Sequence, residues 1–270
     1  RLAKAADNVR NNKNKTNMEV KTLISRKDEI GELAYSLDAM TKDLLLRMDS
    51  IASFAADVSH ELKNPLTSLR SAIETLSIIK DKTKKKRLME IVLEDINRLD
   101  RLITDISDAS RLDADLSRDE MVRINLSKLI DEFIKIRKET IRNVKFIVKV
   151  QDGLIITGNQ ARLIQVFDNL INNAISFSPE NGEINIEAFS KAQKILVTIS
   201  DQGQGISEAK KETIFDRFYT ERPSNEKFGK HSGLGLSIVR QILLSHNANI
   251  YAENIYNERK VAGARFFIEF

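Results

Sequence analysis

Two apolar stripes constrain the fold of the first half of this 270-residue chain. From Ile51 to Leu76 apolar residues recur in steps of three and four, and a second stripe from Val92 to Ile106 has the same steps. A mean spacing of about 3.5 residues is typical of helices that pack along a seam. The basic segment 80–87 between the stripes is predicted to be the solvated tip of an antiparallel hairpin, with a patch for a lipid or a protein partner as the alternative. Because two helices cannot bury both seams alone, a dimeric four-helix bundle is expected.

A single histidine stands out in this hairpin. His60 lies two residues from Val58 and from Leu62, which is about 200° around a helix from each of these stripe residues. The ring is therefore predicted to point away from the seam into solvent. Glu61 places a carboxylate directly beside it in the sequence.

The regions before and after the hairpin differ from it in their sequence patterns. Residues 2–10 give a short helical pattern, 11–27 read as a polar connector, and a second helix is predicted to begin after Asp28 as its cap. After about residue 120, helical segments at 127–141, 160–176 and 234–246 alternate with short strand patterns. Such a mixture predicts an α+β sandwich.

Composition excludes several classes of function. The chain has no cysteine and three histidines, so disulfides and thiol catalysis are excluded and a zinc site is not expected. A net charge of +4 with both signs interspersed is ordinary surface, and no nucleic-acid partner is expected. No apolar run approaches the roughly 20 residues of a membrane span. The chain opens inside an amphipathic pattern, and we expect it to be part of a longer protein.

Three motifs in the second half suit a nucleotide. Asn169 and Asn173 share one helix face, where amide oxygens can ligate Mg²⁺. Asp201 ends an apolar strand before two glycines, and its carboxylate can accept a hydrogen bond from the adenine amine. The third motif is a glycine loop that contains Gly233, Leu234 and Gly235 and precedes a helix, where its N–H groups can bind phosphates. Any one of these motifs by itself more often has a purely structural role than a role in ligand binding.

An aromatic cluster lies between the two glycine motifs. The segment 214–223, IFDRFYTERP, contains Phe218 and precedes the polar stretch 220–232. By itself it reads as core followed by loop. In its position between glycine motifs it is predicted to be the hinge of a mobile lid over a nucleotide.

Taken together, the motifs resemble those of bacterial two-component sensor histidine kinases. SHELKNPL resembles the H box of that family, NLINNA the N box, DQGQGI the G1 box, IFDRFYT the F box and HSGLGLS the G2 box. Their order and intervals agree over about residues 50–240. The sequence of residues 54–76 also resembles that of a ChvG/ExoS-like subgroup of these kinases.

The resemblance implies a role for each matched residue. His60 would be the phospho-acceptor, Glu61 the acid that polarises its ring, and Asn64 the residue that orients water when phosphate is removed from a response regulator. Asn173 would be the Mg²⁺ ligand with Asn169 as its upstream partner. The implied nucleotide-binding set is Asn169, Asn173, Asp201, Gly203, Gly205, Phe218, Gly233, Leu234 and Gly235.

The resemblance also implies an organisation. It places a HAMP domain and connecting helix at 1–48, a dimerisation and histidine phosphotransfer (DHp) hairpin at 49–118, and a Bergerat-type α+β ATP-binding domain at 119–270. ATP and Mg²⁺ would be the cofactors, and the partners would be a second copy and a response-regulator receiver domain. The whole protein would be a receptor at the cytoplasmic face of the bacterial inner membrane, held there by transmembrane segments that this chain lacks.

Two departures from the family pattern are visible. Ser176 and Phe177 stand where the family usually has lysine and tyrosine, so a cation and a hydroxyl are lost; Lys230, Arg217 or Arg222 could supply the cation. Asn247 and Ala248 replace a common glycine pair after the last helix. Because asparagine tolerates the left-handed conformation, this change is expected to be harmless.

Two other functions stay open at the level of sequence. An ATPase with the same ATP fold, such as a chaperone or DNA-repair protein, would share the N, G1 and G2 features but would need no His60–Glu61 pair. A signalling scaffold could keep the fold without activity, and the Ser176–Phe177 departure is what favours it.

Overall fold

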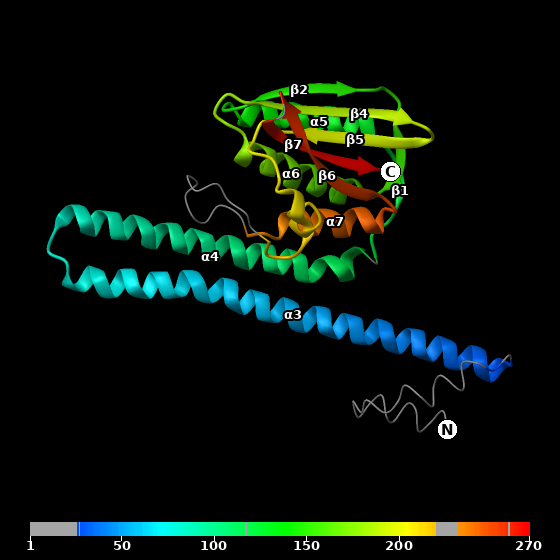
Figure 1. Ribbon diagram of the computed structural model, residues 1–270, viewed down its shortest axis with the longest axis horizontal. Coiled ribbons are helices and arrows are strands. Elements are labelled where there is room, and N and C mark those ends of the chain that lie inside the picture. Colours follow the sequence, from blue (N-terminus) through cyan, green and yellow to red (C-terminus); the bar gives the residue numbers. More distant parts are fainter. Residues whose placement is uncertain (1–25, 27, 117, 220–231, 259) are drawn as a thin grey trace. The chain divides into compact units, whose positions relative to one another are not determined.

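The computed structural model describes residues 26, 28–116, 118–219, 232–258 and 260–270 (Figure 1). The helix predicted at 2–10, and all of the connector at 11–27 except Arg26, lie outside this part. The chain divides into two compact units, residues 1–60 and 61–270, which are described separately. No helix among the described residues is long and apolar enough to cross a membrane.

A 50-residue helix, α3 (Glu29–Ile78), continues through the boundary between the two units. Its start confirms the predicted cap, because Asp28 Oδ1 accepts a hydrogen bond from the Gly31 N–H at 3.1 Å. Glu29 and Glu32 lie in the first turn, where carboxylates interact favourably with the helix dipole.

The tip of the hairpin is shorter than predicted. Helix α4 (Lys82–Leu116) already includes most of the basic segment that was assigned to the tip. Asp81 explains the early start, since its Oδ1 accepts hydrogen bonds from the N–H groups of Thr83 at 2.8 Å and Lys84 at 3.3 Å. A good N-cap therefore starts a helix among lysines, whose side chains stay exposed as expected.

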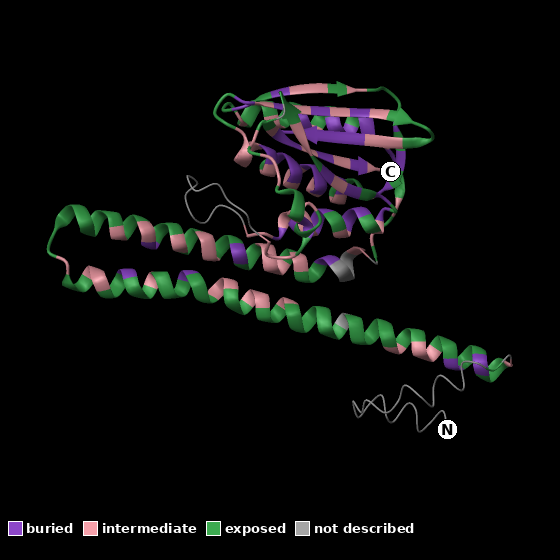
Figure 2. Cartoon of the chain, viewed as in Figure 1, coloured by how far each residue is buried: buried purple, intermediate pink, exposed green. Residues whose placement is uncertain are grey.

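Within the second unit the hairpin buries only part of its apolar surface. Ala72, Val92, Leu102 and Leu112 are buried, whereas many other apolar side chains of the two helices are half-buried or exposed. Figure 2 shows the mixture of exposed and intermediate residues along both helices. The exposed set within this unit includes Leu66, Ile73, Leu93, Ile96 and Ile103.

The remainder of the second unit is an α+β domain. A five-stranded sheet has the order β2-β4-β5-β7-β6, with β2 and β4 parallel and the other neighbours antiparallel, and β1 pairs with β3 in a separate ribbon. The elements are β1 (Val122–Asn125), α5 (Leu126–Thr140), β2 (Lys145–Val150), β3 (Ile155–Gly158), α6 (Gln160–Phe177), β4 (Glu183–Lys191), β5 (Lys194–Ser200), the 3₁₀ turns η1 (Glu208–Lys210) and η2 (Thr213–Phe215), α7 (Gly235–Ser245), β6 (Asn249–Asn257) and β7 (Lys260–Glu269).

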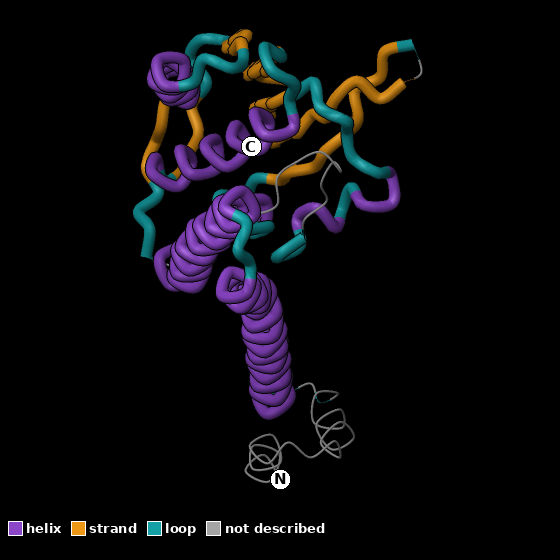
Figure 3. The backbone as a smooth tube through the Cα atoms, turned by 90° about the vertical axis from the view of Figure 1, so that its left-hand side faces the viewer, coloured by secondary structure: helices purple, strands orange, loops and turns teal. Residues whose placement is uncertain are grey.

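Helices α5, α6 and α7 lie on one face of the sheet (Figures 1 and 3). The sequence dictates this layer, because α6 buries a stripe at helical spacing from Leu163 to Ala174. Opposite it, β4 alternates buried Ile184, Ile186 and Ala188 with half-buried residues, as a strand with one covered face must. The predicted α+β sandwich is confirmed.

The end of α7 confirms the expectation for Asn247. This residue has φ 53°, and its N–H donates to the Leu244 carbonyl at 3.1 Å while the Ala248 N–H donates to the Leu243 carbonyl at 2.9 Å. These two bonds are those of a Schellman cap, in which a left-handed residue reverses the chain. Asn247 thus adopts the left-handed conformation that glycine usually provides at this position.

Candidate active site

The predicted nucleotide motifs converge in the α+β domain. Gly235, at the start of α7, lies so close to α6 that a Cβ atom on it would be 3.2 Å from Asn169 Oδ1. Gly203, after β5, lies against the end of α6, where an added Cβ would be 2.8 Å from the Phe177 carbonyl oxygen. The N, G1 and G2 motifs therefore form one site, whose backbones approach closely because the glycines carry no side chain.

Asp201 is held in this site as a buried carboxylate. It is 4% exposed, and its Oδ1 accepts hydrogen bonds from the N–H groups of Gly203 at 2.8 Å and Ala264 at 3.2 Å. No other residue in the described part of the chain bonds to Oδ2. Burial raises the pKa of the carboxyl, against the lowering effect of the two N–H groups. A buried carboxylate with one oxygen oriented and the other available suits recognition of an exocyclic amine.

The glycine loop before α7 is backed by the aromatic segment. Gly233 has φ 75°, and a Cβ on it would lie 2.7 Å from the carbonyl carbon of Phe218. Phe218 itself has φ 60°, a strained backbone conformation for a non-glycine residue of the kind that is common at ligand sites. Leu234 is fully buried, and as the N-cap residue of α7 its own side chain makes no capping hydrogen bond. Its N–H donates to Ser232 Oγ at 3.2 Å. The first-turn N–H groups there suit an anion.

The two asparagines lie on α6 as expected. Asn169 and Asn173 are both half-buried, and Asn169 is the one that contacts the glycine loop. Ser176 and Phe177 form the last turn of the same helix. Among the proposed substitutes for the family's lysine, Arg217 is described and half-buried, whereas Lys230, Arg222 and most of the predicted lid lie outside the described residues.

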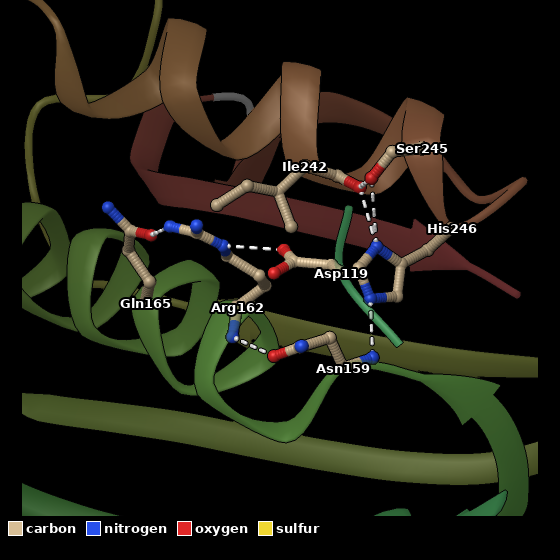
Figure 4. A network of polar contacts seen from close by, with 7 residues as sticks. All are labelled: Asp119, Asn159, Arg162, Gln165, Ile242, Ser245 and His246. Atoms are coloured by element: carbon tan, nitrogen blue, oxygen red, sulfur yellow. Dashed lines mark hydrogen bonds and ion pairs between the residues drawn. The ribbon is translucent and has the colours of Figure 1, made fainter. Parts of the chain in front are cut away.

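The start of α6 is held from two sides (Figure 4). From α7, the buried ring of His246 accepts the Asn159 N–H at its Nε2 at 3.0 Å and donates from Nδ1 to the Ile242 carbonyl at 2.8 Å. From the segment before β1, Asp119 Oδ2 pairs with Arg162 Nε at 2.8 Å. Neither contact is predictable from the sequence, because each joins residues that are far apart in the chain.

The predicted phospho-acceptor motif lies on α3. In the first unit His60 is exposed, as predicted. In the second unit Asn64 is exposed and Pro65 is buried within the helix. Glu61 is half-buried, and its Oε2 pairs with Arg98 Nη2 of α4 at 3.2 Å. Arg98 had no signal in the sequence, since an arginine among many charged helix residues is unremarkable.

Two family models match the chain. Residues 50–115 match the His Kinase A (phospho-acceptor) domain. Residues 158–270 match the histidine kinase-, DNA gyrase B-, and HSP90-like ATPase family, whose members bind ATP. The first match contains the hairpin with His60, and the second contains all the nucleotide motifs.

Several known proteins are similar along the chain. The sensor protein ChvG of Rhizobium meliloti is 46% identical over 99% of this chain and 48% of its own length, and ChvG of Agrobacterium fabrum is 44% identical over 98% and 46%. This chain thus spans about half the length of these relatives. Among solved structures, histidine kinase ThkA, in a complex with response regulator protein TrrA, is 28% identical with a TM-score of 0.63, covering 83% of this chain and 62% of that one.

The helical hairpin, the α+β domain and the motifs are therefore those that both family models and the ChvG proteins lead one to expect. The chain belongs to the sensor histidine kinases and is similar to ChvG within that family.

Proposed function

We propose that the chain transfers the γ-phosphoryl group of ATP to His60 and then serves as donor to an aspartate of a response-regulator receiver domain. A ring nitrogen of His60 would attack the γ-phosphorus, the bond to the β–γ bridging oxygen would break, and ADP would leave as phosphohistidine forms. The observation that carries the proposal is the exposed His60 in one chain with an assembled nucleotide site.

The nucleotide end of the reaction rests on the α+β domain. Asp201 would accept the adenine amine at Oδ2, and Gly203 and Gly205 would let the base approach the backbone. Gly233, Leu234 and Gly235 would present N–H groups to the phosphates, with Phe218 behind them. The geometry of Asp201 supports this arrangement, since both N–H bonds go to its other oxygen.

Mg²⁺ is proposed to bind with ATP through Asn173, with Asn169 beside it. Among the described residues no group of three or more His, Cys, Asp or Glu side chains could hold a metal. A magnesium ion here would therefore take an amide oxygen and phosphate oxygens, a donor set that suits this ion. The ion would neutralise charge on the transferred group.

At the acceptor, Glu61 would stabilise the positive charge that develops on the imidazole, as carboxylates do for catalytic histidines. Asn64 would orient water when phosphate is removed from the partner. Arg98 is the observed partner of Glu61, and the carboxylate would have to turn from it to serve the ring.

The partners and domain limits are proposals as well. A homodimer is supported by the apolar side chains that the hairpin leaves exposed. A receiver-domain partner is supported by the response regulator bound to ThkA. We propose HAMP at 1–48, DHp at 49–118 and the ATP domain at 119–270, in a protein held at the cytoplasmic face of the inner membrane by segments outside this chain.

Transfer of ³²P from γ-labelled ATP tests the proposal. The wild-type chain should acquire label that is stable in base and labile in acid, and His60→Gln should acquire none while it still binds ATP. An ATPase without a phospho-acceptor would hydrolyse ATP without becoming labelled, and an inactive scaffold would do neither. Label that persists in His60→Gln would contradict the assignment of the acceptor.

A further inference from the structure

We propose that Asn254 of β6 is a positioning residue that fixes the loop 201–206 and thereby sets the preference of the site for adenine. This inference rests on the proposed ATP site. It concerns a residue that no sequence motif marks and that lies 48 or more positions from the loop it holds.

The side-chain amide of Asn254 makes two hydrogen bonds to one residue of the loop. Its Oδ1 accepts the Ile206 N–H at 2.7 Å, and its Nδ2 donates to the Ile206 carbonyl at 2.7 Å. Both bonds are short and Asn254 is half-buried. The amide thus replaces a neighbouring strand, satisfying both backbone groups of Ile206 at the end of the loop that is farther from β5.

The other end of the loop is fixed by β7. The Asp201 N–H donates to the Ala264 carbonyl at 2.9 Å, and Asp201 Oδ1 accepts the Ala264 N–H at 3.2 Å. Gly263 permits this approach, because a Cβ there would overlap the Asp201 carbonyl oxygen. The loop is therefore held at Asp201 by backbone groups, and at Ile206 by a side chain that mutation can remove.

Gly205 shows how closely Asn254 packs against the loop. This glycine has φ 76°, and a Cβ on it would lie 2.7 Å from Asn254 Oδ1 and would overlap Val261 Cγ1. The positive φ and the contact together restrict the loop to one path. Loss of the amide would free that path and allow Gly203 to shift. Because the Gly203 N–H donates to Asp201 Oδ1 at 2.8 Å, the orientation of the Asp201 carboxylate would change with it.

A displaced Asp201 matters more for adenine than for phosphate binding. The adenine amine is a donor, whereas guanine has an acceptor oxygen at the corresponding position. A buried carboxylate oxygen at hydrogen-bond distance binds the adenine amine and repels the guanine oxygen. At a longer distance it does neither. Loosening the loop should therefore weaken ATP binding and lower the ratio of ATP to GTP affinity.

Glu208 provides a matched control. It contacts the same amide, with Asn254 Nδ2 at 3.3 Å from Glu208 Oε1, and also accepts from Tyr256 Oη at 3.0 Å. Glu208 is exposed, and in the described part of the chain its carboxylate contacts Asn254, Tyr256 and Lys211 but not the backbone of Ile206. Glu208→Gln should leave both Asn254–Ile206 bonds in place.

The test compares Asn254→Ser, Asn254→Asp and Glu208→Gln with the wild-type chain. Serine is too short for either bond, and aspartate keeps the acceptor but loses the donor. We expect the Kd for ATP to rise roughly tenfold in Asn254→Ser, equivalent to about 1.4 kcal/mol, and less in Asn254→Asp. The ATP/GTP affinity ratio should fall in both variants. Labelling of His60 at saturating ATP should be unchanged. Glu208→Gln should keep the ATP and GTP affinities of the wild-type chain.

The outcomes separate this inference from the proposed function. If the wild-type chain binds ATP and both Asn254 variants bind ATP and GTP like the wild type, the positioning role is overturned, whatever happens to the melting temperature. A lower melting temperature without a change in the ATP/GTP ratio likewise shows a structural role only. If the wild-type chain binds no ATP, the proposed function itself fails.

Discussion

The burial of the Asp201 carboxylate is not explained by a contribution to the stability of the fold. It is almost wholly buried, and burial raises its pKa from the ordinary value of 3.8. A raised folded-state pKa means that the folded protein binds the proton more tightly than the unfolded chain does. The stabilisation from this protonated form is complete below the unfolded pKa and is lost as pH rises through the folded pKa. At neutral pH the buried charge therefore weakens the fold, which is typical of functional groups.

Substitution of Asp201 by asparagine should separate these two effects. The amide keeps an oxygen for the N–H groups of Gly203 and Ala264 but presents NH₂ to the adenine amine. ATP affinity should fall by roughly 1–3 kcal/mol, the usual range for an unmet buried hydrogen bond. The free energy of unfolding without nucleotide should rise above that of the wild type at pH 7, and this gain should shrink as pH falls toward 4. Calorimetric titration and denaturant unfolding measure both; unchanged ATP affinity would remove Asp201 from the adenine site.

At the scale of elements, α6 depends on the contacts at its N-terminus as well as on its buried stripe. His246 holds the Asn159 N–H at the cap of this helix, and the ring fills the space above Gly158, where an added Cβ would lie 2.7 Å from His246 Cδ2. The end of α7 is thus fastened to the beginning of α6. Because α6 carries Asn169 and Asn173 and α7 follows the glycine loop, this contact fixes two sides of the site.

Replacement of His246 by phenylalanine tests this fastening. The ring volume is nearly kept, but the Asn159 N–H loses its acceptor. Because this bond is part-buried, its loss should cost about 0.5–1.5 kcal/mol, the usual net contribution of a hydrogen bond. Thermal unfolding of the variant should show that loss. Asn247→Gly is the matched control at the next residue: glycine adopts the positive φ readily, so its stability should equal or exceed that of the wild type. Equal stability of His246→Phe and the wild type would show that the Asn159 bond contributes nothing.

Elements with strong periodicity were predictable from the sequence, and those that depend on a single capping residue or on distant partners were not. The stripe in α6 and the alternation in β4 exceed any competing pattern, so both elements were found. The strand β1 has four residues and exists because it pairs with β3, which local sequence does not reveal. The overestimated hairpin tip followed from reading lysines as loop, although Asp81 supplied a cap.

The site divides in the same way. Glycines and acidic or amide residues in short motifs were identifiable, because they act through their own backbone or side chain. Asn254, His246 and Arg98 were missed, since each acts through a contact 37 or more residues away. The motif residues provide the proposed chemistry, and the missed residues hold them in position.

For the whole molecule, the proposed cycle requires two opposite reactions from neighbouring residues of one helix. Glu61 carries a charge and is paired with Arg98, whereas Asn64 is uncharged and exposed. The Arg98 guanidinium is largely buried, and its Nε has no hydrogen-bond partner among the described residues. Removal of the Glu61 carboxylate would therefore disturb both the chemistry and this pair, so the choice of variant matters.

Glu61→Gln and Asn64→Ala should damage different reactions. Glutamine keeps the shape and an acceptor for Arg98 but cannot balance charge on the imidazole, so labelling of His60 should slow by about 10²–10⁴-fold, the usual contribution of an acid–base group. Asn64→Ala should spare labelling and mainly slow dephosphorylation of a cognate response regulator, because it removes only a group that orients water. Both variants are run in both assays, with melting temperature as the check on folding. Equal damage to the two reactions by both variants would contradict the division and would point instead to distortion of the helix before Pro65.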